Sequence, residues 1–476
     1  MGGQPHGGAC RAGEGNQVTS TSPPPRPVRL SPLEQSLIAL DSPPVVAHTG
    51  SLALFERPDQ PVTAASLAEH IESVLGPRSK YRHRVRHGIG GPHWVPVPRL
   101  DAAAHIHEHH LADLPAGPTH PAAFGSPRGQ PQAQALSTLE TLVAQRQPMP
   151  LDRRAPLWEI DLIRGLPRGG FALFTRTHLA LVDGDTTPDL LHLLLSGARH
   201  DPDPVPARPV SRRPAAEPGE PLLDLRTVGS HLVKGLGIVL RTARSAGTVP
   251  ASPLNVEVGP HRQYAVSRTR LSQYRRIATA CRHTVNDVLL TVLAGALRTW
   301  LLHEGTYLMP SLRVLTAQSI HGRDGNVLTD VLVDLPVGEP NPLMRLHQTS
   351  YAVGQAVTGL LAVPAAQLTD LAGFAPSTMH TLAARLATQV SRRLFNTMII
   401  NAPGPRQARY VMGARLGANY PVIPLSPWQG LSIGVTSYRG QIHVGFTTDA
   451  GALPDVHGLA AAVPGSLAAL AAAAGE

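Results

Sequence analysis

The chain of 476 residues is too long for one ordinary hydrophobic core, so we expect two domains, and its hydrophobic content of 42% is enough to fold them. The net charge of +9 is carried almost wholly by arginine and suits an anionic lipid or a phosphorylated ligand, while the lack of a zinc-finger, RNP or basic-region pattern excludes nucleic acid. Two cysteines exclude a disulfide framework and suit a reducing cytosol. The chain contains no apolar stretch of about eighteen residues, so we expect no transmembrane helix.

The N-terminal residues 1–28 are rich in Gly, Pro, Ser and Thr and contain no apolar signal core, so we predict a disordered tail. The ordered chain begins with Ser31 and Glu34, whose spacing is that of a capping box at the start of a helix. The apolar pattern then predicts a strand over 52–55 and a helix over 66–75.

Residues 81–87 are densely basic and have two interpretations. We favour a strand with a solvated basic face, and the alternative is a contact with the phosphates of a ligand. The Pro- and Gly-rich residues 116–133 predict a surface loop, and residues 137–146 predict a helix.

A histidine follows a short apolar and aromatic run, residues 171–174, which predicts a buried strand. His178 therefore lies near the strand end, and Asp183 and Gly184 lie in the turn before a Leu-rich helix that Thr187 is expected to cap. An imidazole in this place is held by the fold and can still face a cleft.

The middle of the chain contains the predicted boundary between the two domains. Residues 201–221 contain seven prolines and no apolar periodicity, which predicts a linker. Residues 222–244 predict a helix with an apolar stripe and basic neighbours. A core-facing helix is the favoured interpretation, and a helix lying on an anionic membrane surface is the alternative.

The second half also alternates helices and strands. Residues 270–280 predict a helix, and Asn286 and Asp287 are expected to cap a longer one, with Asn286 as the N-cap and Asp287 complementing the helix dipole. Alternating residues on either side of a turn at 439–440 predict an antiparallel hairpin, and the Ala-rich residues 459–474 predict a final helix.

The stretch from His178 to Gly184 resembles the His-His-x-x-x-Asp-Gly signature of the CoA-dependent acyltransferase superfamily, with Leu179 in place of the second histidine. Other segments match motifs of one family within it, the bacterial wax ester synthase/diacylglycerol acyltransferases. The matching positions are Pro156, Leu157, Trp158, Asn286, Asp287 and the run Asn401, Ala402, Pro403, Gly404 and Pro405.

The resemblance implies an α/β fold of two acyltransferase-like domains, each a mixed sheet with flanking helices, with an active-site tunnel at their interface. The expected domains are residues 29–200, which carry the His178 motif, and 222–476, joined by the linker 201–221. Leu179 and the second and third motif segments, at 156–158 and 286–287, are expected to bind substrate around this tunnel.

The implied reaction transfers a fatty acyl group from acyl-CoA to diacylglycerol, giving triacylglycerol, or to a long-chain alcohol, giving a wax ester. The implied catalytic group is His178 as general base, with Asp183 as a structural anchor and Gly184 allowing a tight turn. No metal and no cofactor beyond the acyl-CoA co-substrate are expected. A water-insoluble acceptor implies a cytosolic protein associated peripherally with a membrane or lipid droplet.

Leu179 stands where the superfamily has its general base, because the second histidine of the superfamily pair is held to be the base. A leucine neither accepts nor donates a proton. If residues 171–179 formed one regular strand, His178 and Leu179 would point to opposite faces, and a bulge would be needed to turn His178 toward the tunnel. His178 is therefore either the base or a satisfied core histidine.

Three functions remain open from the sequence. The first is a lipid O-acyltransferase, impaired by Leu179 and using His178 or orientation alone. The second is a non-catalytic relative that binds acyl-CoA or neutral lipid. The third is an acyltransferase or condensation-type enzyme of secondary metabolism, which the motifs at 156–158 and 286–287 disfavour.

Overall fold

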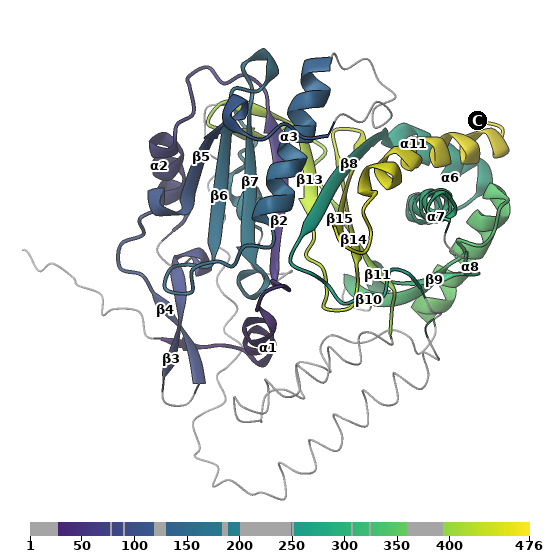
Figure 1. Cartoon of the computed structure of the whole chain (residues 1–476), viewed down its shortest axis with the longest axis horizontal. Coiled ribbons are helices and arrows are strands. Elements are labelled where there is room, and N and C mark those ends of the chain that lie inside the picture. Colours follow the sequence, from purple (N-terminus) through teal and green to yellow (C-terminus); the bar gives the residue numbers. More distant parts are fainter. Residues whose placement is uncertain are drawn as a thin grey trace, which may run out of the picture.

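The computed structural model describes residues 27–76, 79–88, 91–118, 130–182, 189–199, 249, 252–305, 308–322, 325–358 and 394–476. It has two six-stranded sheets that lie side by side, each flanked by helices, and a small three-stranded sheet below the first (Figure 1). This is the α/β architecture with mixed sheets that the sequence predicts. The predicted linker and the helix over 222–244 lie outside the described residues, as do residues 1–26.

The first sheet contains strands from both halves of the chain. In spatial order it is β12 (Tyr410–Val411), β13 (Ala414–Val422), β2 (His48–Phe55), β7 (Phe171–His178), β6 (Trp158–Arg164) and β5 (Ile106–His110). The small sheet joins β1 (Val28–Arg29), β4 (Gly91–Pro96) and β3 (His83–Gly88). The basic residues 81–87 fall mainly on β3, where Arg86 and His87 are exposed.

The second sheet is formed by the second half of the chain alone. In spatial order it is β10 (Gly325–Leu335), β9 (Leu312–Gly322), β11 (Thr397–Pro403), β14 (Leu431–Tyr438), β15 (Gln441–Asp449) and β8 (Arg262–Arg270). β14 and β15 form the predicted hairpin, and Arg439 and Gly440 make its turn with positive φ angles of 45° and 76°. The hairpin prediction is confirmed.

Helices cover the outer faces of the sheets, and one helix lies between the first sheet and β8 of the second (Figure 1). The first half contains α1 (Pro32–Leu40), α2 (Ala64–Val74), α3 (Gln130–Arg146) and α4 (Leu190–Leu194). The second half contains α6 (Leu271–Cys281), α7 (Val285–His303), α8 (Pro342–Thr358) and α11 (Val456–Ala473). The capping box of Ser31 and Glu34 at the start of α1 is present as predicted.

Two predicted caps are wrong. The N-cap of α7 is Thr284, whose extended backbone lets its hydroxyl accept from the Asp287 N–H at 3.0 Å, while Asp287 accepts from the Thr284 N–H at 3.0 Å. Asn286 is thus inside the first helical turn. The N-cap of α4 is Asp189, whose carboxylate accepts from the His192 N–H at 2.8 Å, and Thr187 lies outside the described residues.

Strand β13 departs from the predicted division of the chain at 201–221. It pairs antiparallel with β2, with Val422 opposite Gly50 and Tyr420 opposite Leu52, so a strand from the predicted second domain completes the first sheet. Its other face packs against β14 and β15 of the second sheet. The boundary between the two sheets therefore does not coincide with the boundary predicted at 201–221.

Among the described helices, α7 and α11 have the length and apolar composition of membrane spans. The apolar window of α7 is 72% buried, and Ser466 of α11 donates to the Val292 carbonyl of α7 at 2.8 Å. Buried residues of both helices belong to one hydrophobic core with the second sheet. This packing explains the apolar composition of α7, whereas only 33% of the apolar window of α11 is buried.

Candidate active site

Strand β7 ends at His178, and Leu179 begins the 3-10 turn η5 (Leu179–Leu181). The pairing of β7 with β2 is regular from Phe171 to His178, without a bulge. Alternation therefore stops before Leu179, and the expectation that His178 and Leu179 occupy opposite strand faces does not apply. His178 is fully buried, whereas Leu179 is partly exposed.

The face of β7 that carries His178 is the face turned toward the second half of the chain. Alternate residues of a strand share a face, so His178 lies with Phe174. Phe174 belongs to a core cluster that includes Leu139 of α3 and Tyr264 and Val266 of β8. The predicted strand end thus lies on the side where the two halves meet.

His178 belongs to a buried cluster of three titratable side chains. His48 is its direct partner across β2 and β7, with ring centroids 5.7 Å apart. Asp41, the residue that ends α1, places its Oδ1 3.3 Å from His48 Nε2 and its Oδ2 3.5 Å from His178 Nε2. The three side chains are at most 4% exposed.

Asp41 carries the charge of this cluster. Its carboxylate accepts the Ala47 N–H at 3.0 Å and Arg153 Nη2 at 3.3 Å. Burial on its own would raise the pKa of Asp41, but the contacts with His178 and His48 outweigh burial and hold that pKa well below its usual value. Burial lowers the pKa of His48, and the Asp41 carboxylate offsets this only in part. At neutral pH an ionised Asp41 therefore faces a neutral His48.

Two imidazoles and a carboxylate are also zinc ligands, and the donor atoms of this cluster lie within 4.8 Å of one another. The Arg153 guanidinium, however, already pairs with the Asp41 carboxylate. A divalent cation beside that guanidinium would be repelled. We therefore interpret the cluster as a buried polar network, centred on the Asp41 carboxylate, that holds the end of β7.

Both ring nitrogens of His178 face groups of the protein. Nδ1 accepts the Ala180 N–H at 3.0 Å, which caps η5, and Nε2 faces the Asp41 carboxylate. The Leu179 N–H donates to the Ala47 carbonyl at 2.8 Å. This geometry fits a positioning histidine better than a base exposed to substrate.

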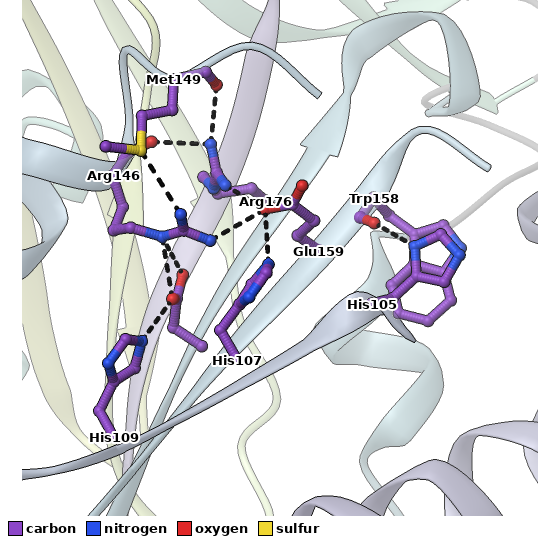
Figure 2. A network of polar contacts seen from close by, with 9 residues as sticks. His105, His107, His109, Arg146, Met149, Trp158, Glu159 and Arg176 are labelled. Atoms are coloured by element: carbon purple, nitrogen blue, oxygen red, sulfur yellow. Dashed lines mark hydrogen bonds and ion pairs between the residues drawn. The ribbon is translucent and has the colours of Figure 1, made fainter. Parts of the chain in front are cut away.

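The Pro156–Leu157–Trp158 motif directly contacts the His178 segment. The His178 N–H donates to the Leu157 carbonyl at 3.0 Å. Trp158 is fully buried, donates from Nε1 to the Tyr81 carbonyl at 2.9 Å and stacks on His105 at 4.2 Å (Figure 2). The motif supports the strand end from the core, and its predicted contact with substrate stays a prediction.

A second ionic network includes Arg176, which precedes His178 by two residues and lies on the same face of β7. Arg146 donates from Nη2 to Glu159 of β6 at 2.9 Å and from Nε to Asp161 of the same strand at 3.1 Å. Figure 2 shows Arg146 beside Glu159 and Arg176. Arg176 also pairs with Glu159 and donates to the carbonyls of Arg146 and Met149. His107 and His109 of β5 reach the same two carboxylates at 3.1 and 2.8 Å.

The motif segments of the second half also meet. Asn401 of β11 donates to Asn286 Oδ1 at 3.1 Å, and Ser350 of α8 donates to Asp287 Oδ2 at 3.4 Å. Their placement beside the end of β7 stays a prediction. Asp183 and Gly184 lie outside the described residues.

Two contacts tie the His178 side of the first sheet to the second half. Arg262, at the start of β8, donates from Nη2 to the Pro44 carbonyl at 2.5 Å, in the loop between Asp41 and His48. Glu140 of α3 accepts the Val266 N–H of β8 at 2.9 Å, and its burial raises the pKa of Glu140 to about 8. The cluster around His178 therefore lies beside the junction of the two halves.

Two family models match this chain over most of its length. The wax ester synthase/diacylglycerol acyltransferase catalytic domain matches residues 131–289, and the C-terminal domain of the same family matches 324–471. The chain belongs to the wax ester synthase/diacylglycerol acyltransferase family. The family expected from the motifs is confirmed, and so is the class of enzyme, an O-acyltransferase of the diacylglycerol acyltransferase and wax ester synthase type.

Relatives of this family resemble the chain over about nine tenths of its length. The O-acyltransferase WSD of Acinetobacter baylyi is 25% identical over 90% of this chain and 94% of its own length. A probable diacylglycerol O-acyltransferase of Mycobacterium tuberculosis, tgs1, is 26% identical over 88% and 90%. The wax ester synthase/diacylglycerol acyltransferase from Marinobacter aquaeolei VT8 superposes with a TM-score of 0.68 at 25% identity, over 94% of this chain and 100% of that one.

A more distant structure shares the fold. The starter condensation domain of rhizomide synthetase RzmA, in complex with C8-CoA and Leu-SNAC, has a TM-score of 0.50 at 13% identity over 94% of this chain and 95% of its own. The fold expected from the superfamily resemblance is confirmed by these superpositions. The tunnel at the interface stays a prediction.

The sequence did not reveal Asp41, His48 or Arg153. Asp41 and Arg153 are 112 residues apart, and only the folded chain joins them. The pairing of β2 with β7 places His48 opposite His178 across a similar span. A local signal existed for Asp41 alone, because it directly follows the predicted first helix.

Proposed function

We propose that this chain transfers a fatty acyl group from acyl-CoA to diacylglycerol or a long-chain alcohol beside the turn that begins at Leu179. One observation supports this place for the reaction: Leu179 is partly exposed directly after the fully buried His178, at the strand end on the side where the halves meet. The relatives carry the names diacylglycerol O-acyltransferase and wax ester synthase.

The proposed reaction needs no metal or further cofactor, because a thioester is already an activated acyl donor. The acceptor oxygen forms a bond to the carbonyl carbon, the carbon–sulfur bond breaks, and the hydroxyl proton ends on the CoA sulfur. Leu179 offers no base, and His178 is engaged by Asp41 and Ala180. Catalysis then rests mainly on holding the two substrates together, which can accelerate a reaction by several orders of magnitude.

In this scheme His178 is a positioning residue. It fixes the turn through its Nδ1, and Asp41 fixes the ring. A second candidate function, acyl-CoA or neutral-lipid binding without turnover, is favoured by the same burial of His178 and by the apolar side chain at 179. The two candidates differ only in turnover.

A purified-protein assay separates them. We expect slow release of the CoA thiol from a long-chain acyl-CoA, with triacylglycerol formed from diacylglycerol or wax ester from a long-chain alcohol. Binding of acyl-CoA without either product would support the lipid-binding function. A protein that neither binds nor turns over acyl-CoA would exclude both.

We further propose that this protein is cytosolic and associates peripherally with a membrane or lipid-droplet surface. Support comes from a water-insoluble acceptor, the net charge of +9 and the exposed Arg86 and His87 of the small sheet. We expect flotation with anionic vesicles at low salt and release at high salt, because salt screens surface charges. A protein that stays in the soluble fraction at low salt with anionic vesicles would contradict this association.

A further inference from the structure

An open cavity of about 340 Å³ lies at one end of the second sheet. Three segments that are separate in the sequence surround it: the hairpin turn between β14 and β15, the first turns of α6, and the residues that follow β11. The last of these contains Gly404 and Pro405 of the family motif. The cavity is apart from the His178 cluster, because β8 runs from its contact with Pro44 at Arg262 to the start of α6, a distance of roughly 26 Å.

Each segment contributes one arginine to the cavity: Arg275 from α6, Arg406 after β11, and Arg439 from the hairpin turn. All three are exposed, and the lining contains no aspartate or glutamate. In the described part of the chain none of the three forms an ion pair, whereas Arg313 and Arg415 each pair with a carboxylate. Three guanidinium groups around one cavity repel one another unless an anion is bound between them.

The backbone adds to this positive potential. Helix α6 has Arg270 as its N-cap and no side-chain cap, so the positive end of its dipole is open near Leu271, which lines the cavity. The Leu271 N–H itself donates to the Gly440 carbonyl at 2.9 Å, which anchors the helix start to the hairpin turn. The hydroxyl-bearing Ser437 is a further lining residue.

Arg439 is at a position that does not favour arginine. Its φ of 45° is in the left-handed region, where the first residue of such a hairpin turn is usually Asn, Asp or Gly. A side chain other than these costs on the order of 1 kcal/mol there. The unfavourable backbone places a third cation at the rim of the cavity.

We propose that this cavity binds the phosphate groups of an organic phosphate. Arginine recognises phosphate through paired hydrogen bonds, and the volume is at the lower end of small-molecule sites. Two ligands share this chemistry: the adenosine phosphates of a CoA ester, and the headgroup of an anionic phospholipid. The first source rests on the proposed function, because a CoA ester has a long flexible arm between its phosphates and its thioester. The proposal that the cavity binds an anion does not depend on the proposed function.

The test compares the parent protein with the triple variant Arg275→Gln, Arg406→Gln and Arg439→Gln. Its matched control replaces three exposed arginines elsewhere, Arg57, Arg99 and Arg282, with glutamine, so both variants lose the same charge. The probes are adenosine 3′,5′-bisphosphate by calorimetry, and vesicles of phosphatidylglycerol or phosphatidylcholine by flotation. Circular dichroism and the thermal midpoint check that each variant is folded.

We expect the triple variant to bind one probe about a hundredfold more weakly than the parent, with the control close to the parent. Loss of adenosine bisphosphate binding identifies CoA as the source, and loss of phosphatidylglycerol binding alone identifies the lipid headgroup. Equal binding by the parent and the folded triple variant, equal loss in the control, or no binding of either probe by the parent would overturn the proposal. Because no probe contains an acyl-CoA thioester, binding of a probe by a parent protein that shows no acyl transfer in the separate assay would count against the proposed function only.

Discussion

Replacing Leu179 with histidine should raise the rate of acyl transfer by roughly a hundred- to ten-thousandfold, which corresponds to about 3–5 kcal/mol of barrier. The change restores an imidazole where the superfamily signature has its second histidine. The backbone there is fixed without the leucine side chain, because the Leu179 N–H is bound to the Ala47 carbonyl. Leu179 is partly exposed, so the loss of buried apolar surface costs less than the roughly 2 kcal/mol of a fully enclosed leucine.

The control is Leu179→Gln, which has similar length and hydrogen-bonding groups but no basic nitrogen. We expect Leu179→Gln to stay near the parent rate. The rate of Leu179→His should fall as the pH drops below about 6.5, because a protonated imidazole cannot accept the acceptor's proton. A folded Leu179→His protein that binds acyl-CoA and works no faster than the parent would show that residue 179 is not the position of the base.

Removing the Asp41 carboxylate should destabilise the fold by about 3–5 kcal/mol. Asp41→Ala leaves the Ala47 N–H without its acceptor and removes the anion that faces two buried imidazoles and Arg153. We expect a clear shift of the urea unfolding midpoint to lower concentration at pH 7. Asp41→Asn, which keeps one oxygen acceptor, should lie between Asp41→Ala and the parent.

Asp152→Ala is the matched control for this change. Asp152 also pairs with an arginine, but its side chain is 50% exposed and that of Arg154 is 90% exposed. Water already solvates such a pair, so we expect no measurable change in the midpoint. Equal midpoints for Asp41→Ala and Asp152→Ala would show that the cluster does not hold the strand end.

Much of the local structure was predictable because its signals are local. The capping box of Ser31 and Glu34 is a four-residue pattern, and Arg439 and Gly440 stand between two alternating strands. The N-cap of α7 was misplaced although Thr284 and Asp287 have the same capping-box spacing, because asparagine is an equally strong N-cap. Where two local signals compete, hydrogen bonding in the folded chain selects one.

The candidate site was predictable only in part. The motif identified His178 and its family, but the role of His178 depends on Asp41 and His48, which reach it through a helix end and a strand register. A sequence pattern contains no information on register between distant strands. The placement of β13 in the first sheet is invisible for the same reason, because its pairing with β2 spans more than half of the chain.

The pairing of β13 with β2 also sets the order in which the strands of the first sheet can assemble during synthesis. The ribosome releases β2, β5, β6 and β7 early, yet the strand that covers the open side of β2, residues 414–422, follows the last of these four strands by more than 230 residues. Until then β2 is an unpaired edge with apolar residues such as Leu52 and Leu54, the kind of surface that promotes aggregation. Completion of the first sheet therefore waits until residues 414–422 have been synthesised, long after the residues that surround His178.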